Sequence, residues 1–296
     1  MSFSLDQLQA FVATVDTGSF SAASRRLGKA QSAISVAVSN LEIDLGNSLF
    51  LRNSRYPSLT PAGERLLMEA RVILERCEHF RGVAKSLGEG VESRLVLAVD
   101  ELYPSERLGA LMDGFSRHFP SVELELLFPL MEDVSRMVLQ ERADLGIMWR
   151  QEILPSTLNF HALGWVPLKI VCAPEHELAR QRVRWEELKR YRQLMVATRN
   201  DSKEKVRLRV AADVWWVESQ WVIVELVQRN LGWAFVPEHV VANALENGSL
   251  VSPGLEFDDH DWPIALELIW HKQRPLGKAG NWLKTTAIAA AASATD

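Results

Sequence analysis

The chain has 296 residues, 47% of them hydrophobic, which is enough to bury a core in each of two domains. Its apolar runs are far shorter than the roughly 20 residues of a membrane-spanning helix, and its first residues lack the basic and hydrophobic pattern of a secretory leader. The two cysteines, Cys77 and Cys172, are isolated, which gives no support to a disulfide framework or a zinc site and predicts two reduced thiols. We therefore expect a cytoplasmic globular protein that uses no metal and no cofactor.

The net charge of −5 would argue against nucleic-acid binding if the charge were evenly spread along the chain. Residues 1–92 hold ten Lys and Arg against ten Asp and Glu, whereas the remaining residues hold 23 against 28. Residues 19–60 contain five cations and two acids: Arg25, Arg26, Lys29, Arg52 and Arg55 against Glu42 and Asp44. A local basic surface, which phosphate binding requires, therefore remains in the N-terminal part.

The first 60 residues predict three short helices. A capping-box pair, Ser4 and Gln7, begins a helix over residues 5–17, and a second helix over residues 21–27 ends at Gly28. The third helix, over residues 31–45, places apolar side chains at steps of four, three and four, which gives it one buried face. Two helices joined by a tight glycine turn are typical of a helix-turn-helix.

The third helix has the character of a DNA-reading helix because its opposite face carries small, polar and largely uncharged residues. Such residues let the backbone enter a major groove, where Gln and Ser can hydrogen-bond base edges. Two short extended stretches around a polar turn then predict a wing that carries Arg52 and Arg55 toward phosphates or a minor groove. The candidate DNA contacts on the helices are Ser21, Arg25, Arg26, Lys29, Gln31, Ser32, Ser35 and Ser39.

A long helix is predicted to follow from Thr60 and Pro61, an N-cap residue and a proline at the first helical position. Seven apolar side chains recur along it at alternating steps of four and three: Leu66, Ala70, Ile73, Cys77, Phe80, Ala84 and Leu87. Such a heptad seam favours pairing with the same helix of a second subunit, and hence a homodimer. The alternative is a seam buried on the chain's own C-terminal domain.

From residue 93 onward, short apolar strands alternate with helices, which predicts α/β layers around a largely parallel sheet. Polar and aromatic side chains follow several predicted strands, at the sheet edge where open α/β folds bind ligands. They are Asp100, Glu101, Phe128, Trp149, Arg150, Thr198 and Ser202. These residues predict a small-molecule pocket, and the alternative for any one of them is an ordinary exposed loop position.

The sequence gives little support to an enzyme. It contains no G-x-S-x-G, H-E-x-x-H, P-loop or G-x-G-x-x-G motif. Ser202 and Lys205 match the short S-x-x-K pattern of acyl-transferring serine enzymes, so a serine hydrolase is one alternative. A ligand sensor that does not contact DNA is another. Neither alternative needs a serine-faced third helix or an arginine-bearing wing, and we predict a DNA-binding regulator that is not an enzyme.

Longer motifs point the same way. The segments AASRRLGKAQSAIS, NLEIDLGNSLFLR and LTPAG follow the A-x-x-L, Q-x-x-x-S, L-E-x-x-L-G-x-x-L-F-x-R and L-T-x-A-G signature in order and spacing. Later, RADLGI, VCAPEHELA and LVQRNLGWAFVP match further segments of the same pattern. Over nearly its whole length, the chain therefore resembles the LysR-type transcriptional regulators of bacteria.

The resemblance implies a winged helix-turn-helix in residues 1–60, a dimerising linker helix and hinge in residues 61–92, and an effector-binding domain in residues 93–296. That domain would be built like a type II periplasmic binding protein, with one lobe over residues 93–162 and 268–296 and the other over residues 163–267. Members are commonly tetramers whose ligand changes the bend of promoter DNA. RNA polymerase is a further expected partner if the chain is an activator.

The resemblance also assigns residues by position. Gln31, Ser32 and Ser35 fall where the reading helix meets bases, and Arg52 and Arg55 where the wing meets DNA. The residues around the effector cleft are Asp100, Glu101, Phe128, Trp149, Thr198, Ser202 and Ser219. The effector itself is not identified by the sequence.

Two departures from the family pattern lie in the reading helix. Ala30 and Ser32 replace the usual serine and proline around Gln31, which weakens the expected helix cap. Val36 stands where many members have a cation, and it could touch a thymine methyl or pack on a neighbour.

A third departure lies in the cleft, where Asp100 and Glu101 replace small hydroxyl residues. Carboxylates there would disfavour an anionic effector unless Arg150 or Arg199 offsets them.

Overall fold

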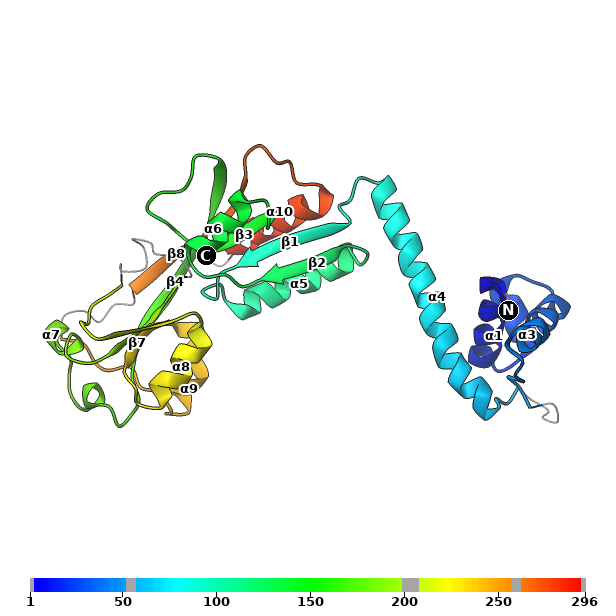
Figure 1. Cartoon of the computed structure of the whole chain (residues 1–296), viewed down its shortest axis with the longest axis horizontal. Helices are drawn as coiled ribbons and strands as arrows, with labels where there is room; N and C mark the ends of the chain where they lie inside the picture. Colours follow the sequence, from blue (N-terminus) through cyan, green and yellow to red (C-terminus); the bar gives the residue numbers. More distant parts are fainter. Residues whose placement is uncertain (1–2, 52–56, 199–207, 257–261, 294–296) are drawn as a thin grey trace. The chain divides into compact units, whose positions relative to one another are not determined.

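The computed structural model describes residues 3–51, 57–198, 208–256 and 262–293. The chain divides into two compact units, Met1–Lys85 and Ser86–Asp296, and each is described by itself. Figure 1 labels most of the elements of both units. Among the described residues, no helix combines the length and apolar character needed to span a membrane.

The N-terminal unit begins with three helices: α1 (Leu5–Thr17), α2 (Phe20–Leu27) and α3 (Gln31–Leu45). The capping box before α1 is confirmed, because the Ser4 hydroxyl accepts from the Gln7 N–H at 3.3 Å while the Gln7 side chain accepts from the Ser4 N–H. The predicted second helix starts one residue earlier, at Phe20. The turn between α2 and α3 needs glycine, since Gly28 has a φ of 63°.

These helices close on a small core whose largest members are Phe11, Ile34, Leu41 and Leu49, each 1% exposed or less. Phe50, just after α3, packs edge-on against Phe11 with ring centroids 5.6 Å apart. The predicted apolar stripe of α3 is therefore its inner face, and its polar stripe is left outside.

The long helix α4 (Pro61–Gly88) starts as predicted, with the Thr60 hydroxyl accepting from the Gly63 N–H at 2.9 Å. Its apolar seam has two halves. Ala70 is buried in the N-terminal core with its neighbours packed beside it, whereas Phe80 is 73% exposed and Leu87 is 56% exposed. The first half of the seam thus has a partner that the sequence did not reveal, namely the chain's own helix-turn-helix core.

The C-terminal unit contains one eight-stranded sheet in the order β2-β1-β3-β8-β4-β7-β5-β6. Its strands are β1 (Arg94–Val99), β2 (Glu123–Leu127), β3 (Leu145–Trp149), β4 (Leu158–Val171), β5 (Gln193–Val196), β6 (Val214–Val217), β7 (Trp233–Pro237) and β8 (Trp262–His271). Its helices are α5 (Ser105–His118), α6 (Glu132–Leu139), η1 (Glu177–Arg180), α7 (Trp185–Leu188), α8 (Gln220–Gln228), α9 (Glu238–Glu246) and α10 (Lys278–Ser293).

The sheet is parallel in its two halves and antiparallel at its centre. Strand β1 runs parallel to β2 and β3, and β5 runs parallel to β6 and β7. The long strands β4 and β8 pair antiparallel with each other, with β8 also antiparallel to β3 and β4 to β7. The prediction of a largely parallel sheet is therefore correct for each half and wrong for the strands that join them.

Strand β4, with 14 residues, is not one of the short strands that the sequence predicts. Its register shifts between Ala162 and Gly164, and its first half alternates irregularly between buried and exposed positions. An irregular pattern of this kind hides the strand from a search for two-residue periodicity. Helix α9 follows Pro237 at the end of β7 with no turn between them, so no turn signal in the sequence marks where it begins.

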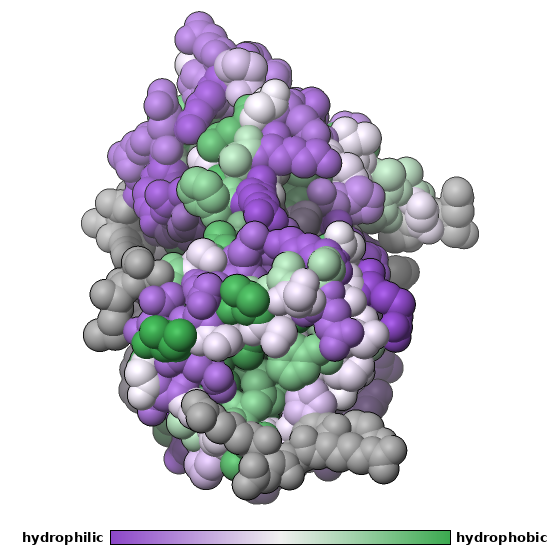
Figure 2. All heavy atoms as spheres, turned by 90° about the vertical axis from the view of Figure 1, so that its right-hand side faces the viewer, coloured by the Kyte–Doolittle hydropathy of each residue, from purple (hydrophilic) through white to green (hydrophobic). Residues whose placement is uncertain are grey.

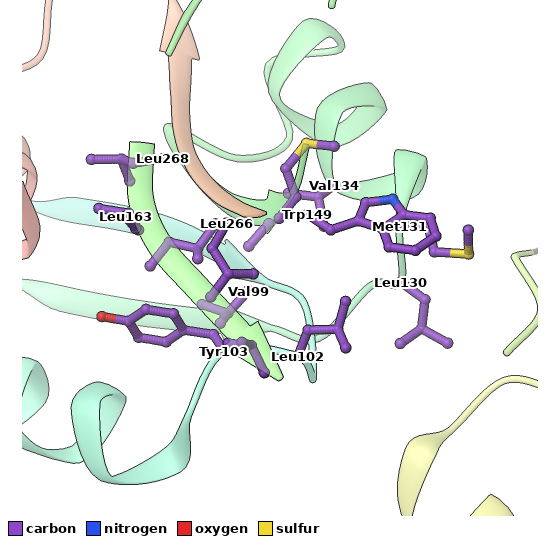
Figure 3. Close-up of a cluster of buried hydrophobic side chains, with 14 of the residues drawn as sticks. Val99, Leu102, Tyr103, Leu130, Met131, Val134, Trp149, Leu163, Leu266 and Leu268 are labelled. Atoms are coloured by element: carbon purple, nitrogen blue, oxygen red, sulfur yellow. The ribbon is translucent and has the colours of Figure 1, made fainter. Parts of the chain in front are cut away.

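The core of the first half of the sheet includes the aromatic and aliphatic side chains drawn in Figure 3, among them Val99, Val134 and Leu266. A second core, around Ile223, Val227 and Val241, lies between α8, α9 and the β5–β7 half. The two long strands connect these two halves, so side chains that follow β1, β3 and β5 approach one another at the centre of the unit.

Candidate functional site

The outer face of α3 carries the predicted base-reading residues. Gln31, Ser32, Ser35 and Ser39 are all exposed, while Ile34, Val38 and Leu41 on the opposite face are buried. Val36 belongs to the outer face too, since 57% of it is exposed, and it does not pack in the core of this unit. Ala30 is the N-cap residue and makes no side-chain cap bond, as the sequence indicated. The first N–H groups of α3 therefore face no side-chain acceptor at the cap.

The predicted phosphate contacts on α2 and the following turn are exposed, and they differ in their partners. Arg26 pairs with Asp16 at 3.3 Å and Lys29 with Asp6 at 2.8 Å, both acids of α1. Arg25 instead donates to the Ser21 hydroxyl at 3.0 Å and has no carboxylate partner within the described part of the chain. Exposed ion pairs contribute only about 0 to 1 kcal/mol, so a phosphate group can compete for all three cations.

The base of the predicted wing is present, because Phe50 and Leu59 form an antiparallel bridge and the Leu51 N–H donates to the Ser58 carbonyl at 2.8 Å. Glu42 of α3 accepts from the Leu49 N–H at 2.6 Å, and it also accepts from the next N–H along the chain. This carboxylate fixes the wing to the reading helix, a role that sequence reasoning missed. Arg52 and Arg55 lie outside the described residues, so their DNA contacts stay predictions.

The C-terminal unit has a cavity at the carboxyl ends of its parallel strands, with a volume of about 40 Å³. Asp100 after β1 and Trp149 at the end of β3 line it from one half, and Gln220 at the start of α8 lines it from the other. Figure 3 shows Trp149 and Met131 next to each other at one end of the apolar cluster, with Leu102 below them. The lining of the cavity also includes Leu168, Gln193, Phe235 and Ile264.

Asp100 is buried, with 1% of its surface exposed. Its carboxylate accepts from the Leu102 N–H at 2.9 Å and from the Met131 N–H at 2.5 Å. Burial raises the pKa of Asp100 to about 6, against the two backbone hydrogen bonds, which lower it. The carboxylates of Glu101 and Glu132 raise that pKa further.

Three of the predicted cleft residues join the two halves of the unit. Glu101 accepts from the Gln220 N–H at 2.6 Å and from the Ser219 hydroxyl at 3.4 Å. Thr198 is buried after β5, and its hydroxyl donates to Glu132 of α6 at 3.3 Å. The chain therefore bridges its own cleft with carboxylates from the β1 and α6 side.

The remaining predicted residues lie elsewhere. Phe128 is 53% exposed and lines a neighbouring hollow, and Arg150 donates to the buried Glu267 at 2.5 Å at the edge of the cleft. Arg199, Ser202 and Lys205 lie outside the described residues. The offset of the cleft carboxylates by Arg199 and the serine-hydrolase hypothesis therefore stay untested.

Gln193 and Gln220 were missed by sequence reasoning. Gln193 is 1% exposed and holds the Val210 and Ala211 N–H groups with its carbonyl oxygen. Gln220 is 5% exposed, and its Oε1 atom has no hydrogen-bond partner among the described residues. The Nε1–H of Trp149 likewise has no hydrogen-bond partner in the described part of the chain. A glutamine at the start of a strand or helix is ordinary in sequence, so only the fold reveals these positions.

The chain matches two family models: "Bacterial regulatory helix-turn-helix protein, lysR family" over residues 5–64, and "LysR substrate binding domain" over residues 88–292. It is 31% identical to the HTH-type transcriptional regulator AceR of Acinetobacter baumannii, over 96% of each chain.

Solved structures with the same fold include HinK, a LysR family transcriptional regulator from Pseudomonas aeruginosa, with a TM-score of 0.52 and 22% identity over 97% of this chain and 98% of that one. They also include full-length LysG from Corynebacterium glutamicum with bound effector Arg, with a TM-score of 0.51 and 19% identity over 98% and 99%.

Proposed function

Because this chain belongs to the LysR family, as a transcriptional regulator with a DNA-binding helix-turn-helix and an effector-binding α/β domain, we propose that α3 reads promoter DNA in the major groove. The observation that carries the proposal is the outer face of α3, where Gln31, Ser32, Ser35 and Ser39 are exposed beside the cations of α2. The DNA phosphates are then contacted by Ser21, by Arg25, Arg26 and Lys29, and by the wing arginines.

Gel shifts on full-length protein with the promoters next to its own coding region test this proposal. Gln31→Ala should change which sequences are preferred, because its amide meets base edges. Arg25→Ala should weaken all sequences alike and flatten the salt dependence, because it meets phosphate. Arg229→Ala, an exposed cation of the C-terminal unit, is the matched control and should change nothing. Equal losses on every sequence for the Gln31 and Arg25 variants would contradict the assignment of base and phosphate contacts.

Val36 has a specific place in this proposal. Val36 is exposed beside Ser32 and Ser35 and does not pack in the core. Of the two alternatives for this side chain, its exposure therefore favours an apolar contact with a thymine methyl. Replacing thymine by uracil at single operator positions removes that methyl. The wild type should lose affinity at one position, and Val36→Ala should be insensitive to the same replacement.

We propose that the exposed second half of the α4 seam pairs two copies of the chain, and that dimers assemble further into tetramers. Phe80 and Leu87 are large apolar side chains left open on a helix, as a dimer interface requires. On the face drawn in Figure 2, hydrophobic side chains form separate areas among hydrophilic ones. Sedimentation of full-length Phe80→Glu should give monomers, whereas Arg81→Glu on the adjacent face should leave the assembly intact.

We propose that the effector binds between a lobe of residues 93–162 and 268–296 and a lobe of residues 163–267, and that it is not chemically changed there. Support comes from the cavity at the strand ends and from Asp100 and Trp149, which both line it. Glu101, Thr198 and Ser219 act by bridging the lobes, and Phe128 and Arg150 act from the rim. Ser202 stays a predicted effector contact. The regulator works in the cytoplasm, where it meets promoter DNA and, if it activates, RNA polymerase.

A thermal-shift screen of metabolites tests this part, since a ligand of the native state raises Tm by mass action. All ten tryptophans lie between residues 149 and 282, so their fluorescence follows the C-terminal unit in the full-length chain. A binder that also changes the gel shift is an effector. Recovery of a chemically altered ligand would contradict the proposal of binding without catalysis.

A further inference from the structure

Two helix N-termini approach the cleft, and both are already occupied by carboxylates of the chain. Asp100 accepts from the Met131 N–H immediately before α6, and Glu101 accepts from the Gln220 N–H at the first residue of α8. A helix N-terminus is where an anionic ligand gains most, because free N–H groups and the helix dipole both favour negative charge. An anionic effector would therefore meet two fixed carboxylates at the positions where it should find donors.

The charge of the residues that line the cavity also disfavours an anionic effector. Among the described residues that line it, Asp100 is the only one with an ionisable carboxyl or basic group. The nearby cation Arg150 is held by Glu267, which is 3% exposed. Glu132 of α6 does not line the cavity, but its charge acts on Asp100, and its buried Oε2 atom has no hydrogen-bond partner in the described part of the chain. The cavity thus presents negative charge and acceptors, together with one unpaired donor, the Nε1–H of Trp149.

Gln220 supplies an independent sign of a missing donor. It is 95% buried, it lines the cavity, and its Oε1 atom has no partner among the residues described. Buried acceptors are rarely left unpaired unless a ligand or water completes them. An N–H group that reached Gln220 would also lie in the cavity that Asp100 lines.

The adjoining space is mostly apolar, with Arg150, Gln151 and Glu152 as polar members of its described lining. A hollow of about 400 Å³ adjoins the cavity and shares Trp149, Leu168 and Ile264 with it, and Trp165 and Trp262 line its far side. Aromatic faces of this kind bind both apolar groups and cations. The small cavity therefore suits a charged head group, and the hollow suits a hydrophobic body.

We infer that the effector of this regulator is a protonated amine with an aromatic or aliphatic body, whose ammonium group is bound by Asp100 and Gln220 and whose body lies against Trp149 and Trp262. The inference rests on the proposed effector cleft and specifies its chemistry. It argues against an anionic effector, because Asp100 and Glu101 already accept at the helix N-termini that would bind an anion. It also explains why a carboxylate can remain buried here: the ligand supplies its counter-charge.

The test compares ligands of one shape and three charges on the full-length protein. Benzylamine, benzyl alcohol and benzoate form one set, and hexylamine, hexanol and hexanoate form another. Thermal unfolding followed by tryptophan fluorescence at about pH 7.5 should show a saturable rise in Tm with the amines. The matched alcohols should bind at least about tenfold more weakly, and the carboxylates should give no shift.

Two variants test whether Asp100 and Gln220 bind the ammonium group. Asp100→Asn should abolish the preference for the amine over the alcohol, whereas Asp113→Asn, an exposed acid on α5, should keep it. Gln220→Leu should weaken the amine and the alcohol alike, because both donate to Oε1. If Asp100→Asn does not fold, the charge series on the wild type still decides the inference.

Two results would overturn the inference: a carboxylate that raises Tm more than its amine, or amines that give no saturable shift in either set. Unchanged amine preference in the Asp100 variant would also overturn it. The proposed regulatory function fails differently, namely by absence of promoter binding in the gel shift. A protein that binds DNA and responds to a carboxylate would keep the proposed function and refute the amine.

Discussion

Replacing Asp100 with asparagine should remove a pH dependence from the stability of the C-terminal unit. Burial holds the pKa of this carboxyl at about 6, against 3.8 for an unperturbed aspartate. As pH rises, the unfolded chain releases this proton before the native chain does. The stability that the protonated carboxyl contributes is therefore present at low pH and is lost as pH rises from about 4 to 6.

The size of the effect follows from the shift. A pKa shift of about two units, at about 1.4 kcal/mol per unit, limits the change in unfolding free energy to about 3 kcal/mol. About 2 kcal/mol of this change falls between pH 4.5 and 7.5. Asparagine also leaves one of the two backbone donors, Leu102 or Met131, without its acceptor. That loss costs about 1 to 3 kcal/mol at every pH, so the change between the two pH values is the diagnostic quantity.

Urea unfolding of the full-length chain, followed by tryptophan fluorescence at both pH values, measures this quantity. The difference in unfolding free energy between wild type and Asp100→Asn should change by about 2 kcal/mol, with the wild type relatively more stable at the lower pH. The Asp113→Asn control should track the wild type. A constant difference between wild type and Asp100→Asn would show that Asp100 titrates near its ordinary pKa and would refute the argument from burial.

Three further substitutions test the packing around the sites. Glu42→Ala should speed hydrogen exchange at the Leu49 amide by tenfold or more, because leaving this buried N–H without its acceptor costs about 1 to 3 kcal/mol. Unchanged exchange would show that Glu42 does not hold the base of the wing. Gln193→Leu should cost about 2 to 4 kcal/mol in urea unfolding, since it strands two backbone N–H groups, and a neutral result would contradict the hydrogen bonds. Gly146→Ala should cost about 1 to 3 kcal/mol because its Cβ would lie 2.7 Å from Val134, and an unchanged midpoint would show that α6 can shift.

The reading helix is the clearest case in which local sequence determined structure. Its inner residues recur at helical spacing, so burial of Ile34, Val38 and Leu41 follows directly, and the exposure of Gln31 and Ser35 follows from the same geometry. Glu42 could not be assigned in this way. Its partners lie seven and eight residues later and depend on how the chain turns after α3.

The linker helix shows the limit of periodicity. A heptad seam states that one side of a helix needs a partner, but not which partner. The structure divides the seam, with Ala70 packed on the N-terminal core and Phe80 left exposed. A pattern uniform in sequence thus has two different environments.

The sequence by itself determined the helix-turn-helix, the alternation of strands and helices, and the unusual carboxylates after β1, because each is encoded within a few neighbouring residues. Only the tertiary structure decided what those carboxylates do. Asp100 and Glu101 cap the N-terminal ends of α6 and α8, whose residues lie about 30 and 120 positions away in the chain. Gln220 faces the same cavity for the same reason: the long strands β4 and β8 join the two halves of the sheet, and no local pattern encodes that meeting.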